Sequence, residues 1–379
     1  MTEALYVGTR KGLLIWTRES GSWKRRDLHF LGDPVTMLLP DPHTPQLFAA
    51  LTLGHFGSKL RRLRDGGPWE ECAVPEYPAG ETIAAGPPSG DEPVETKPAT
   101  LQEIWSLESA ATAQGPLLWA GTIPGGLFCS RDHGDTWELN RPLWNKPERK
   151  KWFGGGKDDP GVHSICVHPH DSKRLTVAVS CGGVWQSENS GEEWTLVGKG
   201  IIARYMPPDL QEDLVTQDPH RLVQNRTDPG VMWIQHHNGI FHSTNGGLEW
   251  REMTHAAPSP FGFAVATHPH DPQTAWFVPA VKDEVRVPVD GKFVVTRTTD
   301  GGRSFTAHGA GLPAEDAFEL VYRHGLDVAS DGRTLAMGTT TGGLWISEDG
   351  GETWDCLSTH LAPIYCVRFG RDLDTSRAT

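Results

Sequence analysis

The sequence lacks the segments that direct a chain into or across a membrane. None of its 379 residues belongs to a run of about 20 apolar residues, so no membrane-spanning helix is expected. The opening stretch, MTEALYVGT, has no basic segment followed by an apolar one, which a secretory signal would need. We therefore expect a cytoplasmic protein that has no membrane partner.

Cysteine and positive charge are also scarce. The six cysteines show no Cys-x-x-Cys spacing, and we expect them to be reduced, buried thiols rather than disulfides or metal ligands. The formal net charge is −13, and the single basic cluster, residues 146–151, is interpreted as a solvated loop. Binding to the phosphates of DNA or RNA needs a basic surface, so no nucleic-acid partner is expected.

Motifs of well-known enzyme classes are absent as well. The sequence contains no Gly-x-Ser-x-Gly elbow, no phosphate-binding loop, no dinucleotide fingerprint and no His-Glu-x-x-His. No cofactor is required by the sequence. An enzymatic function would have to be assembled from residues that are distant in the chain.

What the sequence does contain is a repeat. Glycine (43 residues), proline (29) and tryptophan (15) are abundant, as expected for short strands joined by tight turns. A Gly-rich turn followed by an aromatic residue recurs at intervals of 46 to 68 residues. Its copies end at Trp23, Trp69, Trp137, Trp194, Trp250, Phe305 and Trp354. That interval is typical of a four-stranded propeller blade with variable loops.

The repeats predict an all-β fold, a single seven-bladed β-propeller over residues 1–370. The N-terminus supplies only three strands of the first blade, beginning with Leu5–Gly8. We expect the missing inner strand to be Pro363–Phe369, which would close the ring and leave no open sheet edge. Residues 371–379 are predicted to be a flexible tail.

The repeated turn resembles the Asp box, Ser-x-Asp-x-Gly-x-Thr-Trp, found in sialidases, xyloglucanases, sortilin-type receptors and a photosystem assembly factor. In SEDGGETW the acidic position is Asp349, whereas Asn189 and Asn245 replace it in two other copies. These residues are interpreted as turn-forming and not catalytic, because their side-chain oxygens can accept hydrogen bonds from the turn. The segments GTRKGLLIW and GGLWISEDGGETW make the whole chain similar to bacterial intracellular BNR/Asp-box propellers. That resemblance implies a sialidase-like or glycosyl-hydrolase-like protein, although the N-terminal Phe/Tyr-Arg-Ile-Pro segment of sialidases is missing.

The propeller topology predicts where a ligand would bind. If the strands of a blade are named A to D from the channel outward, the D–A and B–C loops share one face, here called the mouth. The mouth has the long loops, among them residues 74–100, which show no strand pattern and are interpreted as a flexible flap. Candidate ligand-binding residues placed there are Arg10, His55, Lys59, Arg204, His236, Arg286, Arg323 and Tyr365. Cations converging on a cleft suit an anionic or carbohydrate-like small molecule or glycan.

Three functions remain open at this stage. In the first, the mouth binds such a molecule and, if the protein is an enzyme, also hydrolyses it. Glu103, Asp158 and His163 are then the candidate catalytic residues. Alternatively, the propeller is a non-catalytic scaffold for a protein or peptide partner. A second alternative is a metal-dependent hydrolase or lyase with a divalent ion on His55, His163 and His237. The two His-Pro-His-Asp segments, at 168–171 and 268–271, are interpreted as turns and not as metal ligands.

Overall fold

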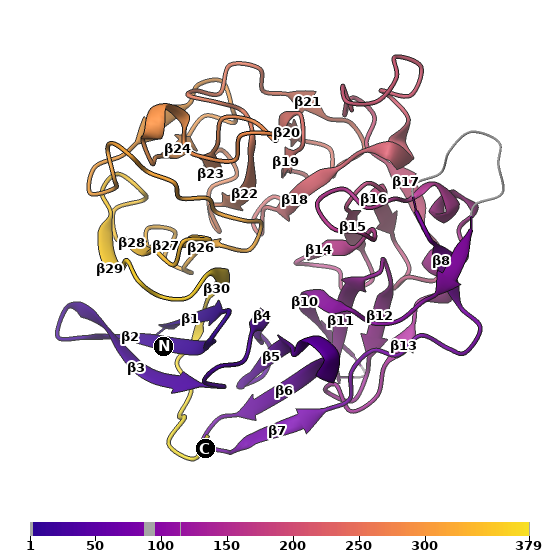
Figure 1. Cartoon of the computed structure of the whole chain (residues 1–379), viewed down its shortest axis with the longest axis horizontal. Coiled ribbons are helices and arrows are strands. Elements are labelled where there is room, and N and C mark those ends of the chain that lie inside the picture. Colours follow the sequence, from indigo (N-terminus) through magenta and orange to yellow (C-terminus); the bar gives the residue numbers. More distant parts are fainter. Residues whose placement is uncertain (1–2, 87–94, 114, 379) are drawn as a thin grey trace.

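The computed structural model describes residues 3–86, 95–113 and 115–378, and nearly all of its regular secondary structure is β-strand. Seven four-stranded antiparallel sheets stand around a central axis as the blades of a propeller (Figure 1). The predicted seven-bladed fold is confirmed. The alternation of short apolar runs with Gly-rich turns favours small antiparallel sheets. In a propeller each sheet has a neighbouring blade on both faces, so the apolar side chains of both faces are covered.

The strands follow one another from the channel outward in every blade. The first three blades contain β30 (Ile364–Arg371), β1 (Glu3–Thr9), β2 (Gly12–Glu19) and β3 (Ser22–His29); β4 (Val35–Pro40), β5 (Gln46–Thr52), β6 (Ser58–Arg64) and β7 (Trp69–Cys72); and β10 (Glu103–Thr112), β11 (Gly115–Ile123), β12 (Leu127–Ser130) and β13 (Glu138–Leu139). The fourth and fifth contain β14 (Val162–Val167), β15 (Leu175–Val179), β16 (Gly183–Ser187) and β17 (Thr195–Val197); and β18 (Pro219–Gln224), β19 (Met232–His236), β20 (Gly239–Ser243) and β21 (Arg251–Glu252). The last two contain β22 (Gly262–Thr267), β23 (Ala275–Pro279), β24 (Val295–Thr298) and β25 (Thr306–His308); and β26 (Leu326–Val328), β27 (Leu335–Gly338), β28 (Leu344–Ser347) and β29 (Asp355–Ser358).

The ring is closed by pairing the two ends of the chain. Strand β30 lies antiparallel to β1, with Leu5 opposite Phe369 and Gly8 opposite Cys366. The inner strands β4, β10, β14, β18, β22, β26 and β30 contact one another in a complete cycle. Beyond β30, where the sequence predicts a flexible tail, Leu373 and Ala378 are buried in the core of the first two blades.

The core lies between the blades. The largest side chains with almost no exposure include Trp119, Trp185, Trp233 and Trp276, each on a second or third strand. The repeated turns are held by side-chain hydrogen bonds: Asp132 Oδ1 accepts from the backbone N–H of Thr136 at 2.9 Å. Asn189 Oδ1 accepts from Glu193 N–H at the same distance, so the amide replaces the carboxylate in this role.

The long loop of residues 74–100 differs from the expectation. It contains a two-stranded hairpin, β8 (Thr82–Ala84) with β9 (Thr96–Pro98), where the sequence shows no strand pattern. The hairpin is stabilised by tertiary packing, since Ile83 is buried against the third blade. The part of the predicted flap from 87 to 94 lies outside the described residues.

Helical segments are short: α1 (Arg141–Trp144) and the 3₁₀ turns η1 (Gly54–Phe56), η2 (Pro147–Lys151), η3 (Leu214–Thr216) and η4 (Val289–Gly291). Within the described part of the chain, no helix has the length and apolar character needed to cross a bilayer. All six cysteines are free, and only Cys356 is exposed.

Candidate functional site

Several inner strands contain a β-bulge near their first residues, at the end that lies next to the mouth. The pairing with the second strand shifts between Ile104 and Ser106, between Val162 and Ser164, between Pro219 and Arg221, and between Gly262 and Val265. The residues that the shifts leave without a paired position are Trp105, His163, His220, Phe263 and Ala264. A β-bulge redirects the side chain of the extra residue, and bulges are frequent beside functional sites. Equivalent positions of four successive blades thus supply large or polar side chains to the mouth.

These bulge residues contact one another across the blades. The ring of Trp105 lies 5.5 Å from that of His163 in an edge-on arrangement, and the ring of His220 stacks on that of Phe263 at 4.3 Å. Arg323, in the loop before β26, places its guanidinium 4.6 Å from the Trp105 ring centre and 5.6 Å from that of Phe263. One arginine of the seventh blade therefore joins the third blade to the sixth.

Arg323 is the most unusual charge in this group. It is only 8% exposed, and no residue that the structure describes forms a hydrogen bond or an ion pair with it. Burial lowers the pKa of its guanidinium, while the nearby Asp218 carboxylate opposes that effect. Two other predicted cations of the mouth are paired: Arg204 with Glu252 at 2.5 Å, and Arg286 with Asp283 at the same distance.

His163 lies beside this arginine and is completely buried. Its Nδ1 is 2.9 Å from Ser164 Oγ, whereas its Nε2 is buried without a hydrogen-bond partner among the described residues. Burial, reinforced by the charge of Arg323, places the pKa of His163 well below its usual value, so the ring is neutral at pH 7. The buried, unpartnered atoms of His163 and Arg323 make this pair the polar centre of the mouth.

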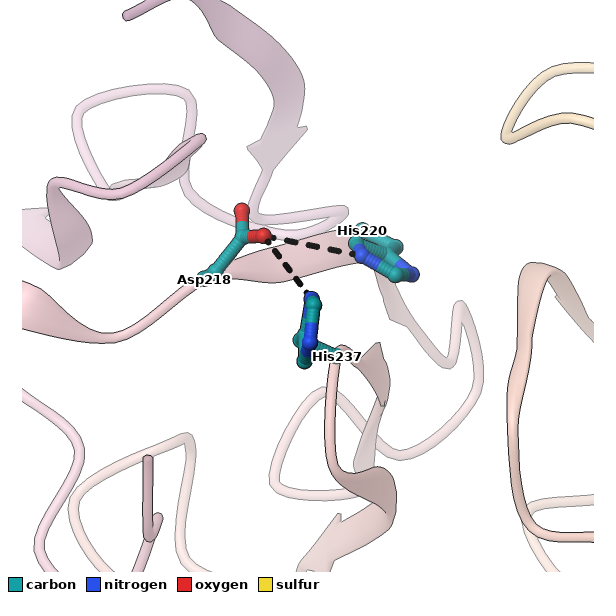
Figure 2. Close-up of side chains that lie close together, drawn as sticks. All are labelled: Asp218, His220 and His237. Carbon is teal, nitrogen blue, oxygen red and sulfur yellow. Dashed lines mark ion pairs between the residues drawn. The ribbon is translucent and has the colours of Figure 1, made fainter. Parts of the chain in front are cut away.

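A second cluster of polar side chains is connected to Arg323 through Phe263, whose ring stacks on that of His220. Asp218 and His220 stand two residues apart at the start of β18, and His237 belongs to the turn between β19 and β20 (Figure 2). Asp218 Oδ2 is 3.6 Å from His220 Nε2 and 3.6 Å from His237 Nδ1. The three candidate ligand atoms all lie within 4.8 Å of one another.

Each member of this cluster is held by further hydrogen bonds. Asp218 Oδ1 accepts from Ser180 Oγ at 3.1 Å and from the backbone N–H of Cys181 at 3.2 Å. His220 Nδ1 is 2.8 Å from the carbonyl oxygen of Gly262, to which it donates. The backbone N–H of Asp218 donates to His236 Nε2, and the N–H of His237 donates to the carbonyl of Asp218. The two loops that bring the cluster together are thereby fixed to each other.

The charges of the cluster influence one another. Burial by itself would raise the pKa of Asp218, but the two imidazoles and Arg323 hold it well below its ordinary value. Burial lowers the pKa of His220. For His237, burial would lower the pKa, yet the Asp218 carboxylate raises it overall. The mouth therefore contains a buried carboxylate that stays ionised at neutral pH.

The remaining predicted residues lie elsewhere on the mouth. Glu103 forms an ion pair with Lys157 at 3.2 Å. Burial raises the pKa of the half-buried Tyr365, and the nearby charge of Arg10 opposes that effect. Asp158 is exposed and lines a small cleft together with Trp144 and Arg149.

His55 and Lys59 belong to the second blade. The ring of His55 is exposed and packs on that of Phe56 at 3.9 Å, while Lys59 is paired with Glu71 at 2.8 Å. Of the three histidines predicted as metal ligands, only His237 joins the Asp218 cluster. His55 and His163 are not part of it, because their blades place them against other partners.

Sequence reasoning missed Asp218, His220, Trp105 and Phe263. A signal was present for the first two, because Asp-x-His precedes a strand and a His-His pair follows at the next turn of the same blade. No sequence signal marks the bulges that turn Trp105 and Phe263 toward the mouth, because each reads as an ordinary apolar strand residue.

Comparison with known proteins agrees with the fold. No family model and no curated protein matches the sequence. Among solved structures, an ancestral GH74 enzyme is 13% identical with a TM-score of 0.56; the match covers 97% of this chain but only 40% of that enzyme. A functionally unknown protein from Desulfotomaculum acetoxidans is 8% identical with a TM-score of 0.55, covering 98% and 99% of the two chains. YCF48 bound to D1 peptide is 13% identical with a TM-score of 0.48, covering 85% and 82%.

The two likenesses with TM-scores above 0.5 bear on the fold alone. At such low identities they do not assign a ligand or a reaction, and this chain spans only about two fifths of the GH74 enzyme's length. The functional argument therefore depends on the side chains of the mouth.

Proposed function

We propose that the protein binds a small anionic molecule, with a carboxylate or phosphate group, at the mouth of the propeller. The observation that supports this proposal is Arg323: a buried guanidinium between two aromatic rings, without an acceptor among the described residues. Removing a charge from water without a partner costs several kcal/mol. A site that retains such a group is prepared for an oxygen anion, because a guanidinium donates paired hydrogen bonds to a carboxylate or phosphate.

The surroundings suit a small ligand. Trp105 and Phe263 hold the guanidinium plane, so little side-chain entropy is lost when the anion arrives. The unpartnered Nε2 of His163 adds a second polar contact on the Trp105 side. A carbohydrate acid satisfies both requirements, with its carboxylate on Arg323 and its ring against an aromatic side chain.

Hydrolysis of the bound molecule belongs to the same proposal, with His163 as the best-placed of the predicted catalytic residues. Glu103 is engaged with Lys157, and Asp158 lies in the cleft beside Trp144, so neither contacts the Arg323 centre in the described structure. A screen of chromogenic glycosides and esters tests this part.

Arg323→Met tests the proposed binding directly, because methionine preserves an apolar stack without the charge. We expect carboxylates or inorganic phosphate to raise the melting temperature of the wild-type protein, and the variant to bind them roughly 10- to 100-fold more weakly, the value of a charge-assisted hydrogen bond. Without ligand, the variant should be as stable as the wild type or more stable, because an unpaired buried charge has been removed.

The matched control is Arg204→Met, which removes an exposed arginine of the same face that is already paired with Glu252. It should leave anion binding unchanged. If Arg323→Met strongly destabilises the fold and no anion shifts the wild-type melting temperature, Arg323 is structural and the proposal is wrong.

A scaffold for a protein partner is the second candidate, and one observation favours it. Of the eight exposed large hydrophobic side chains in the described structure, six lie on loops of the mouth: Leu31, Phe56, Tyr205, Val281, Val285 and Phe318. Apolar side chains gathered on one face are typical of an interaction surface. Co-purification of one stable partner, lost in Phe56→Ser and Phe318→Ser, would support this function over small-molecule binding.

A further inference from the structure

We propose that Asp218, His220 and His237 form a binding site for one divalent transition-metal ion, of the zinc type, at the mouth of the propeller. This inference does not depend on the anion site at Arg323, since it concerns different atoms and has a different probe. It is supported by the identity of the three donors, their spacing and the way each is oriented.

The spacing is the first argument. Tetrahedral zinc with ligands at about 2.0–2.1 Å separates its donor atoms by roughly 3.3 Å. Asp218 Oδ2 lies 3.6 Å from a nitrogen of each imidazole. Hydrogen bonds between nitrogen and oxygen fall at about 2.7–3.2 Å, so both contacts are too long for direct bonds. Both oxygen–nitrogen separations are thus close to those of a tetrahedral site, and the three donor atoms lie within 4.8 Å of one another.

The orientation of the donors is the second argument. His220 donates its Nδ1 proton to the carbonyl of Gly262, which leaves Nε2 to face Asp218. Imidazoles that bind metals are commonly fixed in this manner, with the other nitrogen on a backbone carbonyl. Asp218 is fixed similarly, because Oδ1 takes hydrogen bonds from Ser180 and Cys181 while Oδ2 stays toward the imidazoles.

Burial separates this cluster from ordinary surface groups. Asp218 is 3% exposed and His220 is 2% exposed, and His237 closes the site from the β19–β20 turn with its ring against Tyr205. In this buried setting an ionised carboxylate attracts a cation beside its Oδ2 more strongly than a surface carboxylate does. The two His-Pro-His-Asp segments, predicted to be turns and not metal ligands, behave differently: in both copies a backbone N–H donates to the first histidine of the turn.

The donor set indicates the class of metal. Two imidazoles and one carboxylate suit zinc, iron, cobalt, nickel or manganese, whereas calcium and magnesium prefer oxygen ligands throughout. Three protein ligands also leave coordination positions for solvent or for an oxygen of a bound molecule, as in catalytic rather than structural sites. His220 stacks on Phe263, the ring over which Arg323 lies, so an ion here would sit beside the proposed anion site.

The test uses the metal alone. The full-length protein is stripped with a chelator and titrated with Zn²⁺ by calorimetry, and with Co²⁺ to follow the visible absorption of a nitrogen-coordinated ion. We expect one ion per chain for the wild type. His237→Ala should weaken binding by at least about tenfold and change the cobalt spectrum, since it removes a ligand from a half-buried turn without disturbing the strands. His220→Ala and Asp218→Asn should do the same.

His170→Ala is the matched control, because it removes an exposed histidine from a His-Pro-His-Asp turn and should leave both the affinity and the stoichiometry unchanged. Arg323→Met should also retain the metal, which separates this site from the anion site. The proposal fails if the wild type binds no ion, or if His237→Ala binds one as tightly as the wild type. In either case Asp218 and His237 are a buried ion pair with a structural role.

Discussion

At the scale of single residues, the same burial that builds the blades sets the behaviour of the histidines. His163, His236, His242 and His324 are all buried, and burial lowers the pKa of each. Their roles nevertheless differ, because His163 and His236 stand at the mouth whereas His242 lies within a blade, its ring stacked on Trp233 at 3.9 Å. A low pKa by itself therefore identifies burial, and only the contacts identify a site.

His242 leads to a prediction about acid stability. Burial, with a contribution from Arg251, lowers its pKa to about 4 in the folded protein, against about 6.5 in the unfolded chain. Between these values the unfolded state binds more protons, so stability falls as the pH falls through this window and is constant above it. His242→Gln should remove about 2 kcal/mol of the stability difference between pH 7 and pH 5. Urea unfolding at the two pH values measures it, and an unchanged difference would contradict the assignment.

At the scale of elements, the repeated hairpin turns show which features of a repeat are interchangeable. Asp132, Asn189 and Asn245 all accept hydrogen bonds from the backbone four residues later, although only the first is charged. The aromatic residue that ends each repeat is less uniform. Trp194 and Trp354 are 3% exposed, whereas Trp137 is only half-buried against the loop before β8.

This difference predicts unequal effects of equivalent mutations. Trp194→Ala should destabilise the protein by about 3–5 kcal/mol, because it leaves a cavity between the fourth blade and Asn140, which accepts from its indole. Trp137→Ala should cost clearly less, because part of the ring already meets solvent. Denaturant unfolding of both variants gives the comparison, and equal losses would show that the two turns are packed alike.

At the scale of the whole molecule, stability depends on the pairing of β30 with β1, which joins residues more than 350 positions apart. Cys366 lies in the middle of this seam and is completely buried, whereas Cys356 is exposed on β29. Burial raises the pKa of the Cys366 thiol to about 11. The thiol is therefore shielded from solvent and stays protonated, and both effects keep it unreactive in the folded protein.

Thiol labelling therefore reports on the closure of the ring. In the native protein we expect one thiol to react rapidly, and Cys356→Ser to remove that phase. Cys366 should react only at the rate of global unfolding, because the seam has no independent way to open without exposing two sheet edges. Mass spectrometry of labelled peptides identifies the sites. Labelling of Cys366 well before the other buried thiols would show that the first blade opens separately.

The sequence by itself determined the architecture. The spacing of seven Gly-rich turns with a terminal aromatic residue defines seven blades, and an incomplete first blade requires the C-terminal strand. Both features depend on local chemistry, turn formation and strand length, which neighbouring residues control. The sequence also placed Arg323 and His163 at the mouth, because loop positions follow from strand order.

Only the tertiary structure decided which of the mouth residues meet. Bulges at the start of β10, β14, β18 and β22 turn Trp105, His163, His220 and Phe263 out of the regular strand alternation. The tertiary structure also decides which cations are paired. Arg204 has Glu252 as a partner, whereas Arg323 has none among the described residues. Such contacts join residues that are distant in the chain, and a shift of register by one residue reverses the direction of a side chain. The fold could therefore be predicted from local patterns, whereas the site required the packing of the blades against each other.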